Sequence, residues 1–165
     1  MSKSIAKKNI ILALIWSALS ITVCSVYAQS SNKDFFKITQ NQIVWQEGEK
    51  GVRSTVIFGD PTKPGIYVVR NIFPAGIMSS PHTHNQDRYV TVIRGTWNTG
   101  TSADWDPSRT VALPVGSFMF HPAGGVHFDG SLNEEVEVQI IGMGPVSTDF
   151  LYPKEGHFGK PHKLN

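Results

Sequence analysis

Two stretches of the sequence decide the fold: GIMSSPHTHNQDRYVTVIRG, residues 76–95, and GSFMFHPAGGVHFDGS, residues 116–131. In the first, His82 and His84 stand two residues apart. Side chains two apart leave the same face of a strand, so both imidazoles can reach one point. In the second, His127 follows a glycine-rich turn. Three converging neutral imidazoles suit zinc, iron, nickel, copper or manganese. The alternative interpretation is a pair of hydrogen-bonded surface histidines beside Pro81.

The chain around these stretches is typical of an all-β domain. From Phe35 onward no segment has the 3.6-residue period of a helix. Short runs rich in β-branched and aromatic residues recur instead, separated by turns that contain glycine, proline or aspartate. The expected strands are 43–45, 54–58, 66–73, 89–93, 110–113, 117–120 and 135–141. Many short strands in one domain predict a sandwich or a barrel.

The end of the chain separates into a strand and a polar tail. The predicted strand 135–141 alternates Glu135, Glu137 and Gln139 with apolar residues, as expected of a strand with one face in water. Residues 153–165 are polar and rich in glycine, lysine and histidine. This composition predicts a flexible, loosely held arm in which His157 and His162 are solvated.

The spacing within the two stretches resembles the two signatures of the cupin superfamily. The first signature corresponds to Gly76, His82, His84, Arg88 and Gly95, and the second to Gly116, Pro122, Gly124, His127 and Ser131. The resemblance implies a small double-stranded β-helix, or jelly-roll barrel, over residues 29–152. It implies that His82, His84 and His127 meet inside the barrel and bind a divalent metal ion (Fe, Mn, Ni, Cu or Zn). It also implies a homodimer, since cupins commonly pair through edge strands.

The chain departs from the cupin pattern at two positions: Ser131 replaces the usual asparagine, and Arg88 replaces the glutamate ligand. A guanidinium stays protonated and cannot bind a metal. At about 5 Å and an effective dielectric of about 20, it would repel a divalent ion by roughly 6–7 kcal/mol. Arg88 is therefore expected to point away, to be neutralised by Asp87, Asp129 or a bound anion, or to weaken metal binding. If it faces the site, it is a candidate clamp for a substrate carboxylate.

Other side chains near the motifs have two interpretations each or none in binding. Gln86 has the parity of His82 and His84, so its amide oxygen is a candidate fourth ligand, although 85–87 also fits a turn. His121 is interpreted as a packed or surface histidine, with a place at the barrel mouth as the alternative. The nearby aromatic residues are interpreted as core and are assigned no binding role: Phe118, Phe120, Phe128 and Trp97.

Residues 1–28 are predicted to be a secretory signal peptide that is cleaved after Ala28. Three lysines and no acid precede an almost uninterrupted apolar run over 10–23. A retained membrane anchor and lipidation of Cys24, the single cysteine, are the alternatives. Cleavage would leave a cysteine-free protein in the bacterial periplasm or medium, without stable membrane contact. Twelve basic and thirteen acidic side chains then remain, which gives no basic surface for nucleic acid.

Two classes of function fit these residues. The first is a metal-dependent, dioxygenase-like enzyme that acts on a small anionic or oxygen-rich substrate, because three histidine ligands leave open coordination positions. The second is a non-catalytic cupin that binds a small ligand, with weak or no metal and Arg88 holding an anion. A metal-free structural module is a third possibility. The sequence contains no G-x-S-x-G, H-E-x-x-H or phosphate-loop motif. The barrel hosts many activities, so it implies no particular substrate.

Overall fold

Antiparallel strands joined by tight turns make up residues 35–164 of the computed structural model, which is the part of the chain that the structure describes. The predicted signal peptide, residues 1–28, and Cys24 lie outside this part. Within it, no helix is long and apolar enough to cross a membrane. The helices found there are single 3-10 turns: η1 (Gln40–Gln42), η2 (Glu49–Gly51), η3 (Pro107–Arg109) and η4 (Pro153–Glu155). The all-β prediction is therefore confirmed for residues 35–164.

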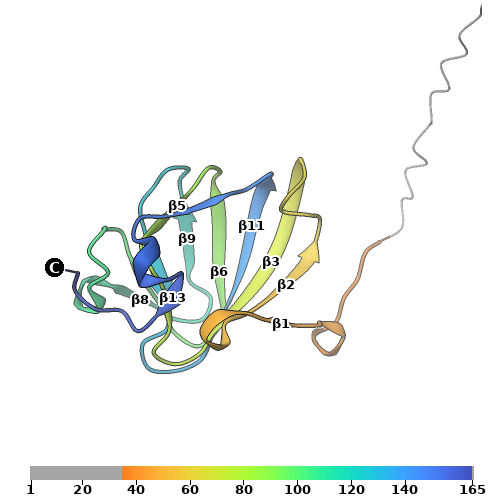
Figure 1. Cartoon of the computed structure of the whole chain (residues 1–165). Coiled ribbons are helices and arrows are strands. Elements are labelled where there is room, and N and C mark those ends of the chain that lie inside the picture. Colours follow the sequence, from red (N-terminus) through yellow and green to blue (C-terminus); the bar gives the residue numbers. More distant parts are fainter. Residues whose placement is uncertain (1–34, 165) are drawn as a thin grey trace, which may run out of the picture. The chain divides into compact units, whose positions relative to one another are not determined.

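Two larger sheets and a strand pair contain the strands (Figure 1). The first sheet has the order β1 (Gln46–Glu47), β2 (Arg53–Phe58), β3 (Gly65–Phe73), β11 (Val136–Gly144), β6 (Arg88–Arg94) and β9 (Phe118–His121). The second has the order β13 (Phe158–Gly159), β4 (Met78–Ser79), β10 (Phe128–Gly130), β7 (Trp97–Gly100) and β8 (Val111–Leu113). The pair consists of β12 (Thr148–Phe150) and β5 (His82–His84).

Alternating side chains of two neighbouring strands of the first sheet, β6 and β11, form much of the core. Val90 and Val92 of β6 are buried, as are Val136, Val138 and Ile140 of β11. Each fully buried valine contributes about 1.5–3 kcal/mol relative to an exposed one. The register pairs Val138 with Val92 and Ile140 with Val90, so the same face of both strands is apolar. This face fixes the position of β6, whose first residue is Arg88.

The longer predicted strands are confirmed, and the shortest ones were missed. The runs at 54–58, 66–73, 89–93, 110–113, 117–120 and 135–141 correspond to β2, β3, β6, β8, β9 and β11 within a few residues. The strand predicted at 43–45 is wrong, because β1 consists of Gln46 and Glu47, which pair with Ser54 and Arg53. Strands β4, β5, β7, β10, β12 and β13 have two to four residues, too few for a periodic pattern.

The outer face of β11 is not uniformly wet. Glu137 was predicted to face water, but only 3% of it is exposed. Its carboxylate lies 3.1 Å from Arg70 and 3.8 Å from Arg94, on the two neighbouring strands. The long arginine side chains cover the glutamate and compensate its charge.

The C-terminal segment is packed, which corrects the prediction of a loosely held arm over 153–165. Phe158 and Gly159 form β13, which pairs with β4. The carbonyl of His157 accepts a hydrogen bond from the Ser80 amide at 2.8 Å. Leu164 packs against the buried cluster of Met78, Trp105 and Phe128. Apolar contacts of Phe158 and Leu164 and backbone hydrogen bonds together attach this mostly polar segment.

Candidate metal centre

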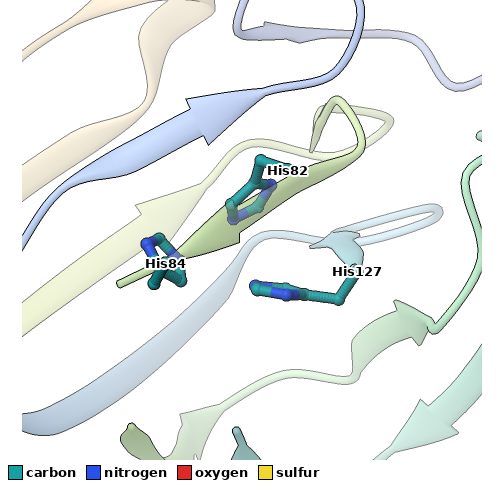
Figure 2. Close-up of side chains that lie close together, drawn as sticks. All are labelled: His82, His84 and His127. Atoms are coloured by element: carbon teal, nitrogen blue, oxygen red, sulfur yellow. The ribbon is translucent and has the colours of Figure 1, made fainter. Parts of the chain in front are cut away.

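Strand β5 and the turn before β10 bring three histidines together. His82 and His84 leave the same face of β5, and both are buried. His127 lies opposite His82, because the two residues exchange backbone hydrogen bonds of 2.9 and 3.0 Å. Figure 2 shows the His127 ring extending toward the two rings of β5. One ligand nitrogen from each residue lies within 4.8 Å of the other two. The predicted convergence of His82, His84 and His127 is therefore present.

Backbone carbonyls orient these rings. The Nδ1 atoms of His82 and His127 lie 2.8 Å and 2.9 Å from the carbonyl oxygens of Ser80 and Gly125. Nδ1 of His84 lies 3.2 Å from the carbonyl of Ser147. A carbonyl can only accept, so each Nδ1 donates its proton and each Nε2 keeps a lone pair. This second-sphere arrangement is the one that holds metal-binding histidines in most metal sites.

Burial keeps the imidazoles neutral. It lowers the pKa of His82 to about 4, to which positive charge on His127 also contributes. Burial, followed by the charge of Arg88, lowers the pKa of His84 to about 2. The pKa of His127 is also lowered by burial, although the carboxylate of Asp129 opposes the shift. Neutral imidazole is the form that binds metal, so the cluster is ready for an ion at neutral pH.

Arg88 points into the cluster. Its Nη1 contacts Nε2 of His84, and its Nε is buried without a hydrogen-bond partner. Of the three alternatives predicted for Arg88, the one in which it points away from the site is therefore excluded. Asp87 accepts a hydrogen bond of 2.7 Å from the Ala123 amide. Burial lowers the pKa of the Arg88 guanidinium, and the charges of Tyr67 and Asp129 oppose this shift. Arg88 thus presents a buried positive charge with an unused donor.

A second group of ligand atoms adjoins the first. His121 ends β9, is 3% exposed, and has no hydrogen-bond partner on either ring nitrogen. Its ring centroid lies 3.9 Å from that of His127. Asp129, 6% exposed, places Oδ2 3.6 Å from Nε2 of His127. Ligand atoms of His121, His127 and Asp129 lie within 4.8 Å of one another. Neither His121 nor Asp129 was predicted to be a metal ligand, although His127 and Asp129 repeat the two-residue spacing of His82 and His84.

Two cavities meet at Arg88. The first, of about 290 Å³, is lined by His82, His84 and His121 together with Asp129 and Arg88. The second, of about 270 Å³, is lined by polar and apolar side chains, and it shares Asn71, His84, Arg88 and Thr148 with the first. Gln86 lies in the bend between β5 and β6 and is not among the lining residues. Its role as a ligand stays a prediction.

The C-terminal segment forms one wall of the first cavity. Phe150 of β12 lies with its ring centroid 5.3 Å from that of His82 and stacks on His157 at 4.3 Å. Phe158 of β13 lines the same cavity. Nδ1 of His157 lies 3.4 Å from a carboxylate oxygen of Glu49. The site therefore depends on residues that follow the two sequence motifs by nineteen positions or more.

Comparisons with known proteins agree on the fold and leave the activity open. The family model described as "Domain of unknown function (DUF4437)" matches residues 37–153. No curated protein matches the chain. Among solved structures, KdgF from Halomonas sp. is 19% identical, with a TM-score of 0.53 over 64% of this chain and 91% of that one. The polyketide cyclase RemF from Streptomyces resistomycificus is 16% identical, with a TM-score of 0.57 over 72% and 87%.

A structure described as an RmlC-like cupin, from Shewanella frigidimarina, is 12% identical, with a TM-score of 0.55 over 68% of this chain and 94% of that one. These identities show the fold alone. The fold is cupin-like, which agrees with the fold that the resemblance implied.

Proposed function

The chain belongs to the DUF4437 family of domains of unknown function, and we propose that it is a cupin that binds a divalent metal ion through His82, His84 and His127. The observation that carries this proposal is the orientation of the three rings. Each Nδ1 faces a backbone carbonyl, which leaves the Nε2 lone pairs of three buried, adjacent rings for a metal ion. Imidazole accepts zinc, copper, iron, nickel and manganese to different degrees, so the residues fit a metal without selecting one.

The cavity suits a small anionic or oxygen-rich substrate. Three neutral ligands leave a bound ion its full double charge and open coordination positions, and such an ion supplies Lewis-acid or dioxygen chemistry. The free donor of Arg88 and the ring nitrogens of His121 face the same space. Arg88 would bind a carboxylate or enolate oxygen, and the aromatic wall of Phe150 and Phe158 would exclude water. A dioxygenase-like enzyme is the activity we propose for this arrangement.

One observation favours a second function. Nη1 of Arg88 contacts Nε2 of His84, the atom that the metal would need. In that arrangement the guanidinium competes with the ion, and the cavity is a receptor for an anion. A non-catalytic cupin that binds a small anionic ligand, with weak or no metal, is therefore the alternative.

Export and pairing belong to the same proposal. A signal peptide cleaved after Ala28 would place the protein in the bacterial periplasm or medium. A homodimer is supported by an exposed apolar row across three neighbouring strands of the first sheet, made by Phe120, Tyr89 and Ile141. Apolar side chains in such a row are a common feature of protein interfaces.

Metal content tests the proposal. The protein without residues 1–28 is purified without chelator or histidine tag, and metal per chain is measured by mass spectrometry. We expect about one equivalent, which binds more weakly to a His82→Ala/His84→Ala variant, is lost in His127→Ala, and is kept in the exposed-site variant His162→Ala. Absence of metal even after incubation with each candidate ion would rule out the enzyme and leave the anion-binding cupin.

A further inference from the structure

We propose that the cavity contains a second metal position, formed by His121, His127 and Asp129, and that one ion occupies either this position or the three-histidine position. The inference rests on the proposed metal binding and extends it. Ligand atoms of the three residues lie within 4.8 Å of one another, the same limit that holds for His82, His84 and His127. The two groups share His127.

The polar atoms of the second group lack other partners. Both ring nitrogens of His121 and Nε2 of His127 are buried without a hydrogen bond. A buried polar group left in this state costs about 1–3 kcal/mol, so such groups are uncommon unless something binds them. Nothing else in the described protein satisfies these three nitrogens, and a metal ion would satisfy at least two of them at once.

The separation of the ligand atoms suits an ion. Oδ2 of Asp129 lies 3.6 Å from Nε2 of His127, which is too long for a hydrogen bond. Two ligand atoms at about 2.1 Å from a tetrahedral ion are about 3.4 Å apart. The His121 ring packs against His127 with centroids 3.9 Å apart, and its free nitrogens complete the group.

The donor set differs in charge from the first position. Two imidazoles and a carboxylate form the set that holds catalytic zinc and non-haem iron in many enzymes. Asp129 supplies the negative charge that the first position lacks because Arg88 stands where cupins carry glutamate. Arg88 of β6 lies opposite His121 of β9 in the antiparallel register, so the charge of Arg88 is near both metal positions. Only the second position has a carboxylate to offset that charge.

The two positions cannot be filled at the same time, because both need His127. Its Nδ1 donates to the Gly125 carbonyl, so Nε2 is its single ligand atom. Contact with Arg88 already engages Nε2 of His84, so filling the first position requires the guanidinium to move. Ions that accept carboxylate oxygen readily, such as manganese, should prefer the second position, and copper the first.

The test uses the protein expressed from the full 165-residue sequence, in the processed form that the host releases. Association constants for Zn²⁺ and Mn²⁺ are measured by competition with a chromophoric chelator. The variants are His82→Ala/His84→Ala, His121→Ala/Asp129→Asn and His127→Ala. The matched control is His162→Ala/Asp149→Asn, which changes exposed residues of the same types. Circular dichroism checks that each variant is folded.

Alternative positions for one ion add their association constants. We expect each double variant to bind one equivalent of metal. The association constant of the wild type should be close to the sum of the constants of the two double variants. His121→Ala/Asp129→Asn should weaken Mn²⁺ binding more than Zn²⁺ binding. His127→Ala should weaken both ions by more than the roughly 10–100-fold that loss of an outer-sphere partner costs. Anomalous diffraction at the zinc and manganese edges would locate the ion in unmodified protein, with density beside Asp129 expected for manganese.

Three results separate this inference from the proposed function. Wild-type affinity in His121→Ala/Asp129→Asn, with no binding in His82→Ala/His84→Ala, would overturn the second position and leave the proposed function intact. Wild-type affinity in His82→Ala/His84→Ala would support the second position and overturn the three-histidine assignment. No binding by the wild type would overturn both.

Discussion

At Arg88, a positive charge stands beside the nitrogen atoms that would bind the metal. Its contact with Nε2 of His84 and its buried, unused Nε show that the guanidinium belongs to the cavity. A divalent ion at about 5 Å would be repelled by roughly 6–7 kcal/mol at an effective dielectric of about 20. The same charge would attract a carboxylate. Arg88 therefore favours anion binding at the expense of metal binding.

An Arg88→Glu variant tests whether Arg88 favours anion binding over metal binding. We expect the variant to bind metal more than tenfold more tightly, because the carboxylate attracts the ion that the guanidinium repels. A change of about 1.4 kcal/mol in binding free energy corresponds to a factor of about ten in affinity. Binding of a monocarboxylate probe, benzoate, should be lost. Metal content after dialysis against a chelator and saturation-transfer NMR with benzoate measure the two effects. Arg109→Glu, which changes an exposed arginine outside the cavity, is the control. Unchanged metal retention in Arg88→Glu would show that the guanidinium does not act on the ion.

Among the strands, β13 connects the C-terminal segment to the site. Phe158 packs against the main core, makes an edge contact with Phe73 at 6.1 Å, and lines the histidine cavity. Gly159, its neighbour in β13, pairs with Met78 of β4. A strand of two residues gains little from its own backbone hydrogen bonds, so the aromatic side chain is what holds it.

Phe158→Ala should therefore destabilise the protein. Because Phe158 is only partly buried, we expect a loss of about 2–3 kcal/mol in the free energy of unfolding, below the range for fully buried phenylalanine. Phe118→Ala is the matched control, since Phe118 is 60% exposed, and it should change the free energy by less than about 0.5 kcal/mol. Urea titration measures both. Equal values for the two variants would mean that β13 is not held by Phe158.

How far the sequence predicts this protein differs between elements. Strands β3, β6 and β11 have seven to nine residues, so their composition and alternation were enough to locate them. Strand β5 has three residues and was found only because it carries His82 and His84. The burial of Glu137 depends on Arg70 and Arg94, which come from strands distant in sequence. The residue pattern within a single strand contains no information about such neighbours on other strands.

The residues of the candidate site also differ in how far the sequence predicts them. The convergence of His82, His84 and His127 was predicted, the first two from their two-residue spacing on one strand and the third from the resemblance of the second motif. The direction of Arg88 and the approach of His121 to His127 depend on the pairing of β6 with β9, and the wall of Phe150 and Phe158 depends on packing of the C-terminal segment. These are long-range contacts, and they decide how the cavity discriminates between a metal and an anion.

Burying four histidines in one barrel makes folding of the metal-free protein depend on pH. Burial lowers the pKa of His82 to about 4 and of His84 and His121 to about 2, and it also lowers that of His127. In the unfolded chain these groups titrate near pH 6.5. Below that pH the unfolded chain binds protons that the folded chain does not, so the free energy of unfolding rises with pH.

The stability of metal-free protein should thus be level above about pH 7 and fall as the pH decreases from about 6.5 toward 4. The three histidines with the largest shifts, His82, His84 and His121, give a limiting slope of about 4 kcal/mol per pH unit, since each contributes about 1.4. Urea titrations between pH 7.5 and 5 measure the slope, with His121→Phe expected to reduce it by one proton and the exposed-site variant His162→Ala to leave it unchanged. Stability that is constant or rises on acidification would mean that the buried rings are protonated in the folded state. That charge would also exclude the metal, because an imidazolium has no lone pair to give it.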